Sequence, residues 1–349
     1  MVDCSVFTYT NKDFISDVSS GQQTRSRFDI ALRSGWTEKR NAGLFRYHLH
    51  DLETRILPGY IAQLNILRGI ERRKPQEILS IRQNFDPKQF NFNKINPKEL
   101  LFELQKESES SCDARCHPNT KRKCKVIINV SPLEFGHCLL VPEPDRCQPQ
   151  ILTPLAVQMG IETVLLSADP GFRVGFNSLG GFASVNHLHL HGYYLNHQLR
   201  IETSPAEPIL PKKHLYCLLD FPVGFLFYTQ SSTLDLIVNA VCSLTDIMVD
   251  RNIAHNLFIT RGCPPLSERD TSLSRNGVRV IVWPRQSSFG AKEESAFNVA
   301  LCELAGHLPF KNKEDFETAT EDGVQDIIRK YLLPQEEFSE LQKHVMKCL

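Results

Sequence analysis

Three histidines at every second position are the feature that most constrains this chain. His187, His189 and His191 lie in the segment VNHLHLHGYYL. On a β-strand, side chains at this spacing share one face about 7 Å apart, while the intervening Leu188 and Leu190 face the other way. The pattern therefore predicts a strand that buries its leucines in the core and lines a surface or cleft with imidazoles.

Two kinds of chemistry use clustered imidazoles. Two histidines at positions i and i+2 can share a zinc ion. A hydrolytic zinc site usually needs a further ligand, however, and the residues that follow His191 are glycine, two tyrosines and leucine. A neutral imidazole can instead attack a phosphorus atom, provided that a carbonyl fixes its far N–H and donors flank the phosphate.

The remaining patterns predict an α+β fold with a mainly antiparallel sheet and packed helices. Apolar spacing predicts helices in RFDIALRSGWTEKR and GYIAQLNILRGIERRK, and short strands are expected in FNFNKI (90–95) and ELLFEL (99–104). KVIINVS and HCLLVPE, joined by PLEFG, are typical of an antiparallel hairpin. Further elements are expected as a helix at 152–167, a strand at 172–178, a strand at 223–229, a helix at 232–252, strands at 256–260 and 278–284, and helices after residue 293.

The order of strand, helix and strand occurs twice and suggests an internal duplication. We therefore expect a catalytic half at 27–210, a second half at 211–349 and a mobile loop at 105–123.

Charge and cysteine content narrow the class of protein. Forty Lys and Arg balance forty Asp and Glu, so no global field favours nucleic acid or an anionic membrane. The first residues, MVDCSVFTYTNKDF, lack the pattern of a signal peptide, and no apolar run approaches the roughly 20 residues of a spanning helix. The eleven cysteines are expected to be reduced thiols. These features predict a cytoplasmic protein with a small-molecule partner.

Several segments resemble a known family. HLHLHGY resembles the signature of the histidine triad superfamily, and INVSPLEFGHCLLVP and FNSLGGFASVNH are similar to its hairpin and its Gly-rich approach to the triad. From Leu57 to Glu317 the chain resembles the animal GDP-D-glucose phosphorylases, relatives of the plant GDP-L-galactose phosphorylases and, more distantly, of galactose-1-phosphate uridylyltransferase. The plant enzymes and the uridylyltransferases have Gln at the third triad position, where this chain has His191.

The resemblance implies phosphorolysis of GDP-D-glucose by inorganic phosphate, which gives GDP and D-glucose 1-phosphate. The middle histidine, here His189, would form a covalent guanylyl intermediate, and no metal or other cofactor is implied. Distant relatives form dimers, but the sequence leaves a homodimer open. A histidine triad hydrolase, a non-catalytic guanine-nucleotide binding protein and a zinc hydrolase are the alternatives.

Candidate substrate contacts follow from this interpretation. We expect His191 to donate to phosphate and His187 to orient the loop, while His137 could support the triad from behind. Phosphate donors are also expected among Asn177, Ser184 and the backbone N–H groups of Gly180 and Gly181, although a Gly-Gly pair is commonly only a turn.

Guanine is assigned to Asn91, Asn93 and Lys94 beside Phe90 and Phe92, although an ordinary edge strand would show the same alternation. Phosphates could also be met by basic side chains, and nothing local selects among Arg82, Arg279, Arg285 and Lys292.

One polar segment contains residue types that bind zinc, at irregular spacing: Cys112, Cys116, His117 and Cys124.

Overall fold

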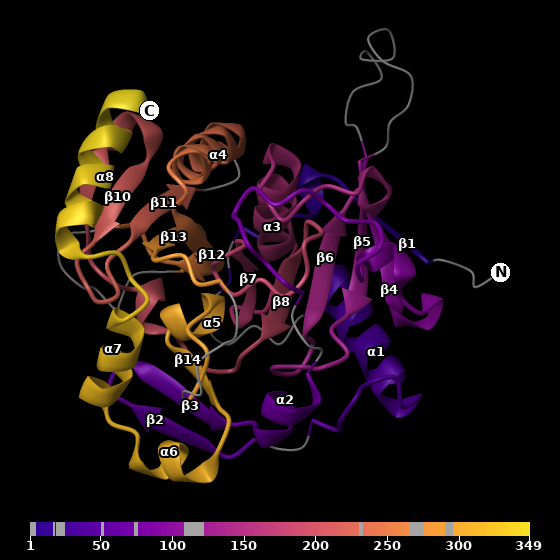
Figure 1. Ribbon diagram of the computed structural model, residues 1–349. Helices are drawn as coiled ribbons and strands as arrows, with labels where there is room; N and C mark the ends of the chain where they lie inside the picture. The colour runs from indigo at the N-terminus through magenta and orange to yellow at the C-terminus, as the bar shows by residue number, and fades with distance from the viewer. Residues whose placement is uncertain are drawn as a thin grey trace, which may run out of the picture.

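An eleven-stranded sheet forms the centre of the molecule (Figure 1). The computed structural model describes residues 5–16, 18, 25–49, 52–72, 76–107, 122–229, 233–265, 275–289 and 296–349. The strand order is β1-β4-β5-β6-β8-β7-β12-β13-β11-β10-β9. The strands are β1 (Val6–Tyr9), β4 (Leu100–Lys106), β5 (Lys123–Ile128), β6 (Cys138–Pro142), β7 (Phe172–Asn177), β8 (Leu190–Tyr194), β9 (Ala206–Leu210), β10 (Leu215–Leu218), β11 (Phe225–Thr229), β12 (Ala254–Gly262) and β13 (Gly277–Arg285).

A second, three-stranded sheet joins distant parts of the chain. It has the order β14-β3-β2, with β2 (Thr54–Leu57), β3 (Tyr60–Leu64) and β14 (His307–Phe310). Strand β14 runs parallel to β3, and β1 runs parallel to β4, whereas the other strand pairs are antiparallel. The predicted α+β class with a mainly antiparallel sheet is therefore confirmed.

Helices cover both faces of the large sheet. The helices are α1 (Arg27–Asn41), α2 (Ile66–Glu71), α3 (Pro154–Leu166), α4 (Leu234–Asp250), α5 (Leu301–Leu304), α6 (Lys313–Thr318), α7 (Glu321–Arg329) and α8 (Gln335–Cys348). Helices α3 and α4 pack side by side on one face and bury leucine, isoleucine and valine against it. Helix α3 is apolar on nearly all sides, as expected for a helix between a sheet and its neighbour. The small sheet, α5, α6 and α7 belong to the hydrophobic core on the other face (Figure 1).

The chain repeats one topological unit. Strands β5 and β6, helix α3 and strands β7 and β8 are matched by β10, β11, α4, β12 and β13. Outward from the central β7–β12 pair, the sheet order is β7-β8-β6-β5 in one direction and β12-β13-β11-β10 in the other. This order supports the predicted relation between two halves. The proposed division at residue 210 stays a prediction, and β9, which ends there, pairs with β10.

Two predicted elements are wrong. GYIAQLNILRGIERRK is not one helix, because Tyr60–Leu64 forms β3 between β2 and β14, and only Ile66–Glu71 is helical. FNFNKI is not a strand, because the Asn91 side chain accepts the N–H of Asn93 and starts a 3-10 turn over Phe92–Lys94. In both segments a local apolar pattern fits more than one structure, and pairing partners or a side-chain cap decide between them.

The histidine segment is only partly a strand. Regular pairing begins at Leu190, so His187 and His189 precede β8 in irregular backbone. The leucines nevertheless face the core as predicted, since Leu188 and Leu190 are both fully buried. The alternation of faces thus holds outside the ladder as well.

Two further expectations concern loops and membranes. Of the predicted loop at 105–123, both ends belong to strands β4 and β5, and residues 108–121 lie outside the described residues. Within the described part of the chain, no helix is long and apolar enough to span a bilayer.

Candidate active site

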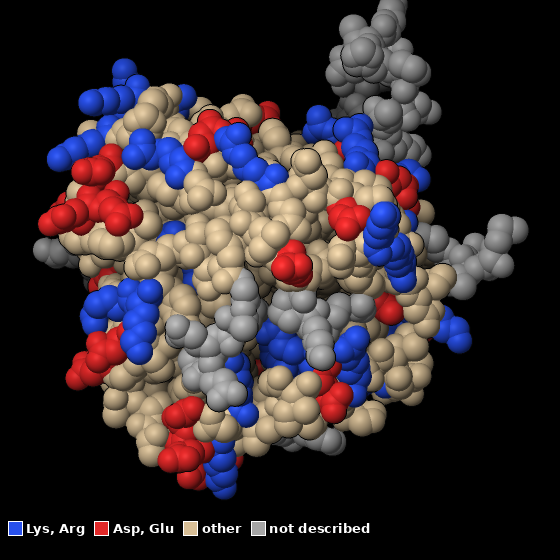
Figure 2. Space-filling model, viewed as in Figure 1, with Lys and Arg blue, Asp and Glu red and all other residues tan. Residues whose placement is uncertain are grey.

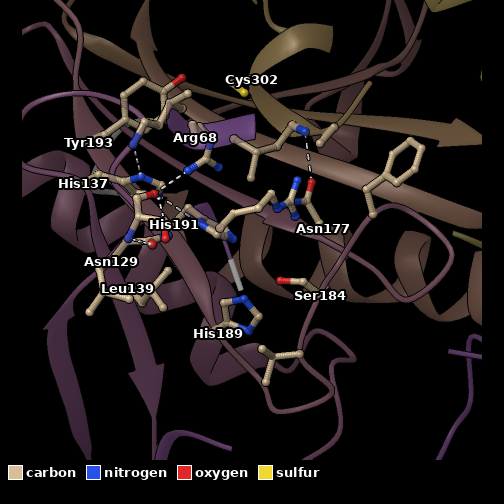
Figure 3. Close-up of a pocket in the computed structure, with 18 of the residues that line it drawn as sticks. Arg68, Asn129, His137, Leu139, Asn177, Ser184, His189, His191, Tyr193 and Cys302 are labelled. Atoms are coloured by element: carbon tan, nitrogen blue, oxygen red, sulfur yellow. Dashed lines mark hydrogen bonds between the residues drawn. The ribbon is translucent and has the colours of Figure 1, made fainter. Parts of the chain in front are cut away.

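A cleft opens between the large sheet and the end of α2, on the sheet face opposite α3 and α4. His189, His191, Asn177 and Ser184 all line it, and Figure 3 shows His189, Asn177 and Ser184 around one open space. The cleft is lined from one side by β5, β6 and β8, and from the other by α2, α5 and the end of β14. Segments that are far apart in the sequence therefore build one site.

His189 is held as a neutral imidazole with one nitrogen free. Its Nδ1 atom lies 2.7 Å from the carbonyl oxygen of His187. A carbonyl can only accept, so Nδ1 carries the proton and Nε2 keeps its lone pair. Burial lowers the pKa of His189 to about 4, which keeps the ring neutral at physiological pH. No described residue hydrogen-bonds Nε2, so this nitrogen is available as a nucleophile.

The backbone of His189 is fixed by a buried amide. Gln150 accepts the N–H of His189 through Oε1 at 2.9 Å and donates through Nε2 to its carbonyl at 3.0 Å. The same Nε2 also donates to the carbonyl of Asn177 at 3.0 Å. Gln150 therefore holds His189 and Asn177 in place relative to each other, although His189 lies before the first residue of β8.

His191 is oriented by a second imidazole, that of His137. The N–H of Leu133 donates to Nδ1 of His137 at 2.8 Å, so the proton of the neutral ring is on Nε2. That Nε2 lies 3.1 Å from Nδ1 of His191 and donates to it. His191 must then carry its own proton on Nε2, which makes it a donor. The rings of His189 and His191 are 5.2 Å apart.

The neutral state of both rings follows from their burial. Desolvation lowers the pKa of His137 and of His191 well below the usual histidine value, and the charge of Arg68 lowers both further. The amide of Asn129 also approaches Nε2 of His137, at 3.3 Å. Because Asn129 accepts the N–H of Ser131 through Oδ1, its NH2 group faces the ring. His191 is thus the acceptor for the His137 proton among the described residues.

His187 is buried, and both of its ring nitrogens are hydrogen-bonded within the protein. Its Nδ1 accepts the N–H of Phe92 at 3.0 Å, and its Nε2 donates to the carbonyl of Pro144 at 3.1 Å. Its ring stacks on Phe92 with the centroids 5.5 Å apart. His187 is buried and is not among the residues that line the cleft. Its predicted orienting role therefore has a geometric basis, although the role itself stays a prediction.

Asn177 presents its NH2 group to the cleft. Its Oδ1 accepts two hydrogen bonds, from Nδ2 of Asn256 at 2.6 Å and from the N–H of Leu301 at 3.0 Å. Asn256 cannot rotate, because its own Oδ1 accepts a bond from Arg285 at 3.1 Å. With its oxygen occupied, Asn177 can act in the cleft only as a donor. Asn256 and Arg285 support the site from the second half of the chain.

The Gly-Gly turn and Ser184 differ in their access to the cleft. Ser184 lines it beside His189. Gly180 and Gly181 are not lining residues, and the N–H of Gly181 donates to the carbonyl of Ser178 at 2.9 Å. Gly181 instead permits close packing, since a Cβ atom there would lie 2.8 Å from the carbonyl of His255. Phosphate binding by the Gly180 and Gly181 backbone stays a prediction that this geometry does not favour.

The predicted guanine contacts are engaged within the protein. Asn91 caps the 3-10 turn, Asn93 donates to the carbonyl of Pro144, and Lys94 donates to three backbone carbonyls. None of these three side chains is among the cleft residues. Their contact with guanine stays a prediction, whereas Phe90 and Phe92 do line the cleft.

The end of the cleft near Phe92 is apolar. Phe92 lies 4.8 Å from the ring of His189, measured between centroids. It belongs to a small hydrophobic cluster with Ile127, Leu139 and Val185, all of which line the cleft. Such a surface can bury the faces of a planar base.

The opposite end is polar and cationic, and sequence reasoning missed it. Arg68, Arg72 and Lys311 line the cleft there, together with Asn298 and Glu303. Figure 2 shows Lys and Arg side chains gathered around the recess next to α2. The two arginines were hidden in a segment predicted as one long helix, and their spacing of four residues was the available signal.

The basic residues proposed from the sequence lie elsewhere. Arg82 pairs with Asp250 at the surface, and Arg279 is buried with bonds to the carbonyls of Ile201, Ser204 and Cys263. Arg285 reaches the site indirectly, through Asn256 and through the ring of Phe182, which lines the cleft. Lys292 lies outside the described residues. None of the three described residues lines the cleft.

The proposed zinc ligands fall mostly on undescribed positions. Cys112, Cys116 and His117 lie outside the described residues. Cys124, by contrast, is fully buried in the hydrophobic core on β5. Within the part of the chain that the structure covers, no group of three or more His, Cys, Asp or Glu side chains could hold a metal ion.

Comparisons of the sequence identify close relatives. The family model described as GDPGP1-like, N-terminal domain matches residues 27–193, and the model described as GDPGP1-like, C-terminal domain matches residues 201–349. GDP-D-glucose phosphorylase 1 of Danio rerio is 77% identical over 355 residues, which cover 100% of both proteins. GDP-D-glucose phosphorylase 1 of Homo sapiens is 54% identical over 326 residues, 91% of this chain and 83% of the human protein.

Comparison of the fold gives a more distant neighbour. The crystal structure of yeast Ap4A phosphorylase Apa2 in complex with Ap4A aligns with a TM-score of 0.58. The alignment covers 88% of this chain and 98% of the yeast chain at 15% sequence identity, so the likeness concerns the fold alone. The expected histidine triad-like fold is thereby confirmed.

Proposed function

Because the chain belongs to the GDP-D-glucose phosphorylase family of nucleotidyltransferase-type enzymes, we propose that it cleaves GDP-D-glucose with inorganic phosphate through a guanylyl-His189 intermediate. The observation that carries the proposal is the bond from Nδ1 of His189 to the carbonyl of His187. This bond holds the proton on one nitrogen and leaves the lone pair of Nε2 in the cleft.

The reaction then consists of two displacements at the α-phosphorus. In the first, Nε2 of His189 attacks, the bond from phosphorus to the bridging oxygen breaks, and its electrons leave with glucose 1-phosphate. In the second, an oxygen of inorganic phosphate attacks, the N–P bond breaks, and its electrons return to Nε2 as GDP forms. The proton on Nδ1 of His189 stays there throughout, hydrogen-bonded to the carbonyl of His187.

Charge stabilisation at the α-phosphate falls to fixed donors. Nε2–H of His191 and the NH2 group of Asn177 both lie in the cleft beside His189, and the hydroxyl of Ser184 can add a third bond. Because neighbouring groups hold the two named donors in place, little reorganisation is needed as charge develops. Hexose phosphate is a good leaving group, so a strong general acid is not required.

The apolar end of the cleft suits the base. Guanine could lie against Phe92, Ile127, Leu139 and Val185, with the α-phosphate at the histidines and the hexose phosphate toward α2. The cytoplasmic location, the homodimer and the contacts that distinguish guanine from other bases stay predictions.

A product analysis tests the proposal. We expect GDP-glucose consumption to require phosphate and to yield equimolar GDP and glucose 1-phosphate. GDP-glucose labelled at the α-phosphorus should transfer its label to the protein in the absence of phosphate, and phosphate should release it as GDP. Formation of GMP at the same rate with or without phosphate would instead identify a hydrolase. Binding of GDP without turnover of any nucleotide sugar would identify a non-catalytic binding protein.

A further inference from the structure

The cleft has two ends of opposite character, and His189 and His191 lie between them. The end at Phe92 is apolar, whereas Arg68, Arg72 and Lys311 line the other end. In a substrate made of a base, two phosphates and a hexose, the groups beyond the α-phosphate would extend toward the cationic end. The residues at that end therefore face the group that is exchanged in the reaction.

Arg72 is a partly buried cation without a hydrogen-bond acceptor among the described residues. It lies directly after α2, with Arg68 one helical turn before it. Burial lowers the pKa of Arg72 to about 10, and the positive charge of Arg68 adds to this effect. Two like charges repel each other, and they do so more strongly where they are partly removed from water. Such an arrangement is relieved when an anion binds between the two guanidinium groups.

Arg68 is positioned differently from Arg72. One of its terminal nitrogens donates to the carbonyl of Ser131, which anchors the guanidinium beside His137 and His191 (Figure 3). Glu303 also lines this end, but its carboxylate accepts the N–H of Ala300 at 2.9 Å. Lys311 is likewise engaged, because its ammonium group donates to Asn298 at 3.0 Å. Arg72 is thus the cation with the most free donors.

Arg68 lies on the His191 side of the cleft, away from His189 (Figure 3). Both charges contribute to the lowered pKa of His191, whereas neither contributes to that of His189. With the α-phosphorus at Nε2 of His189, we place the two arginines beyond it, on the side of the leaving group. This is where the leaving group departs and where its replacement must enter.

We propose that Arg68 and Arg72 form the subsite for the exchanged phosphate group and so direct the guanylyl enzyme to phosphate rather than to water. This inference rests on the proposed function. In the first displacement the subsite holds the phosphate of the departing hexose 1-phosphate, and in the second it holds inorganic phosphate. A planar guanidinium can form two parallel bonds to phosphate oxygens, which orients the attacking oxygen as well as binding it. Water, which is neutral, is held much less strongly by the same two charges.

The ratio of GDP to GMP among the products measures this selection. It depends only on how the guanylyl enzyme is resolved, so a slow first step does not affect it. At phosphate concentrations below saturation, we expect Arg72→Gln to lower the GDP-to-GMP ratio about tenfold or more, because a charged bidentate contact is lost. Arg68→Gln should act in the same direction, and Arg72→Lys should recover part of the ratio. An unchanged ratio in both glutamine variants would overturn the subsite.

Two controls separate the possible failures. Arg82→Gln removes an equal charge at a surface ion pair outside the cleft, and its product ratio should match the wild type. Covalent labelling of Arg72→Gln by GDP-glucose labelled at the α-phosphorus, at whatever rate, and a thermal midpoint equal to that of the wild type show that His189 and the fold are intact. If the wild type itself makes no GDP from GDP-glucose and phosphate, the proposed function fails together with the subsite. If the wild type makes GDP and both glutamine variants give the wild-type ratio of GDP to GMP, only the subsite fails.

Discussion

The Nε2 atom of His137 lies 3.1 Å from the Nδ1 atom of His191, and this contact decides which nitrogen of His191 faces the cleft. The backbone N–H of Leu133 fixes the proton of His137 on Nε2. This backbone group therefore sets the tautomer of His137, which in turn sets the tautomer of His191. His137 follows Gly136 in the loop before β6 and does not need to touch the substrate to act in this way. We infer that it is a positioning residue.

Replacement of His137 should lower the turnover number and leave substrate binding nearly unchanged. We expect His137→Leu to lower kcat about 10- to 100-fold with a small change in KM for GDP-glucose, because His191 loses the partner that sets its tautomer. His137→Gln can accept from Leu133 and donate to His191, so it should retain much more activity. Steady-state kinetics of both variants tests this order. Equal losses in the two variants would show that His137 only fills space.

The nucleophile is tested by His189→Gln, which preserves the approximate volume of the side chain. We expect loss of covalent labelling by GDP-glucose labelled at the α-phosphorus and a fall in phosphorolysis of about a thousandfold or more. GDP binding should persist, because His191 and the apolar end of the cleft are unchanged. Calorimetric titration with GDP provides the control. Retained labelling would place the nucleophile elsewhere.

Much of the fold was predictable because its patterns are local. The alternation around Leu188 and Leu190 predicted a buried face, and apolar periodicity predicted α1, α3 and α4. The hairpin of β5 and β6 followed from two β-branched runs joined by PLEFG. These features depend on neighbours within a few residues, which a single sequence displays. Strand β14 was missed because it depends on pairing with β3, more than 240 residues earlier.

The candidate site was predictable only in its local part. His189 and His191 line the cleft together with Asn177, as the triad segment and its Gly-rich approach suggested. Asn256 could not be anticipated, because it contacts Asn177 across 79 positions of the sequence. Arg72 was equally hidden, since its role depends on how α2 docks against the large sheet. Contacts of this kind are set by tertiary packing and have no signature in a local pattern.

Asn177→Asp tests the donor role of the amide. The substituted carboxylate keeps an oxygen for the bonds from Asn256 and Leu301, so the fold should be retained. Its second oxygen would face the α-phosphate where an NH2 group stood, and like charges repel. We expect kcat/KM for GDP-glucose to fall about 100-fold or more. The thermal midpoint checks the fold, and activity within a few-fold of wild type would remove Asn177 from the phosphate site.

Acid sensitivity should depend on His255, which is buried on β12 next to Asn256. Burial lowers the pKa of His255 to about 4, below the value of 6.5 expected when the chain is unfolded. Between these two values the unfolded chain binds more protons, so the free energy of unfolding falls as the pH decreases. For one such histidine the loss is about 2 kcal/mol between neutral pH and pH 5.

His255→Phe removes this titration and keeps a ring that can stack on Phe176, whose centroid lies 5.9 Å from that of His255. It also removes Nε2, which is buried and has no hydrogen-bond partner. Urea unfolding of wild type and variant at pH 7.5 and pH 5 should therefore show a smaller acid-induced loss in the variant, by up to about 2 kcal/mol. The difference between the two pH values cancels any change in packing that the substitution causes. An equal loss in both proteins would mean that His255 does not contribute to acid sensitivity and that other buried histidines, such as His307, dominate it.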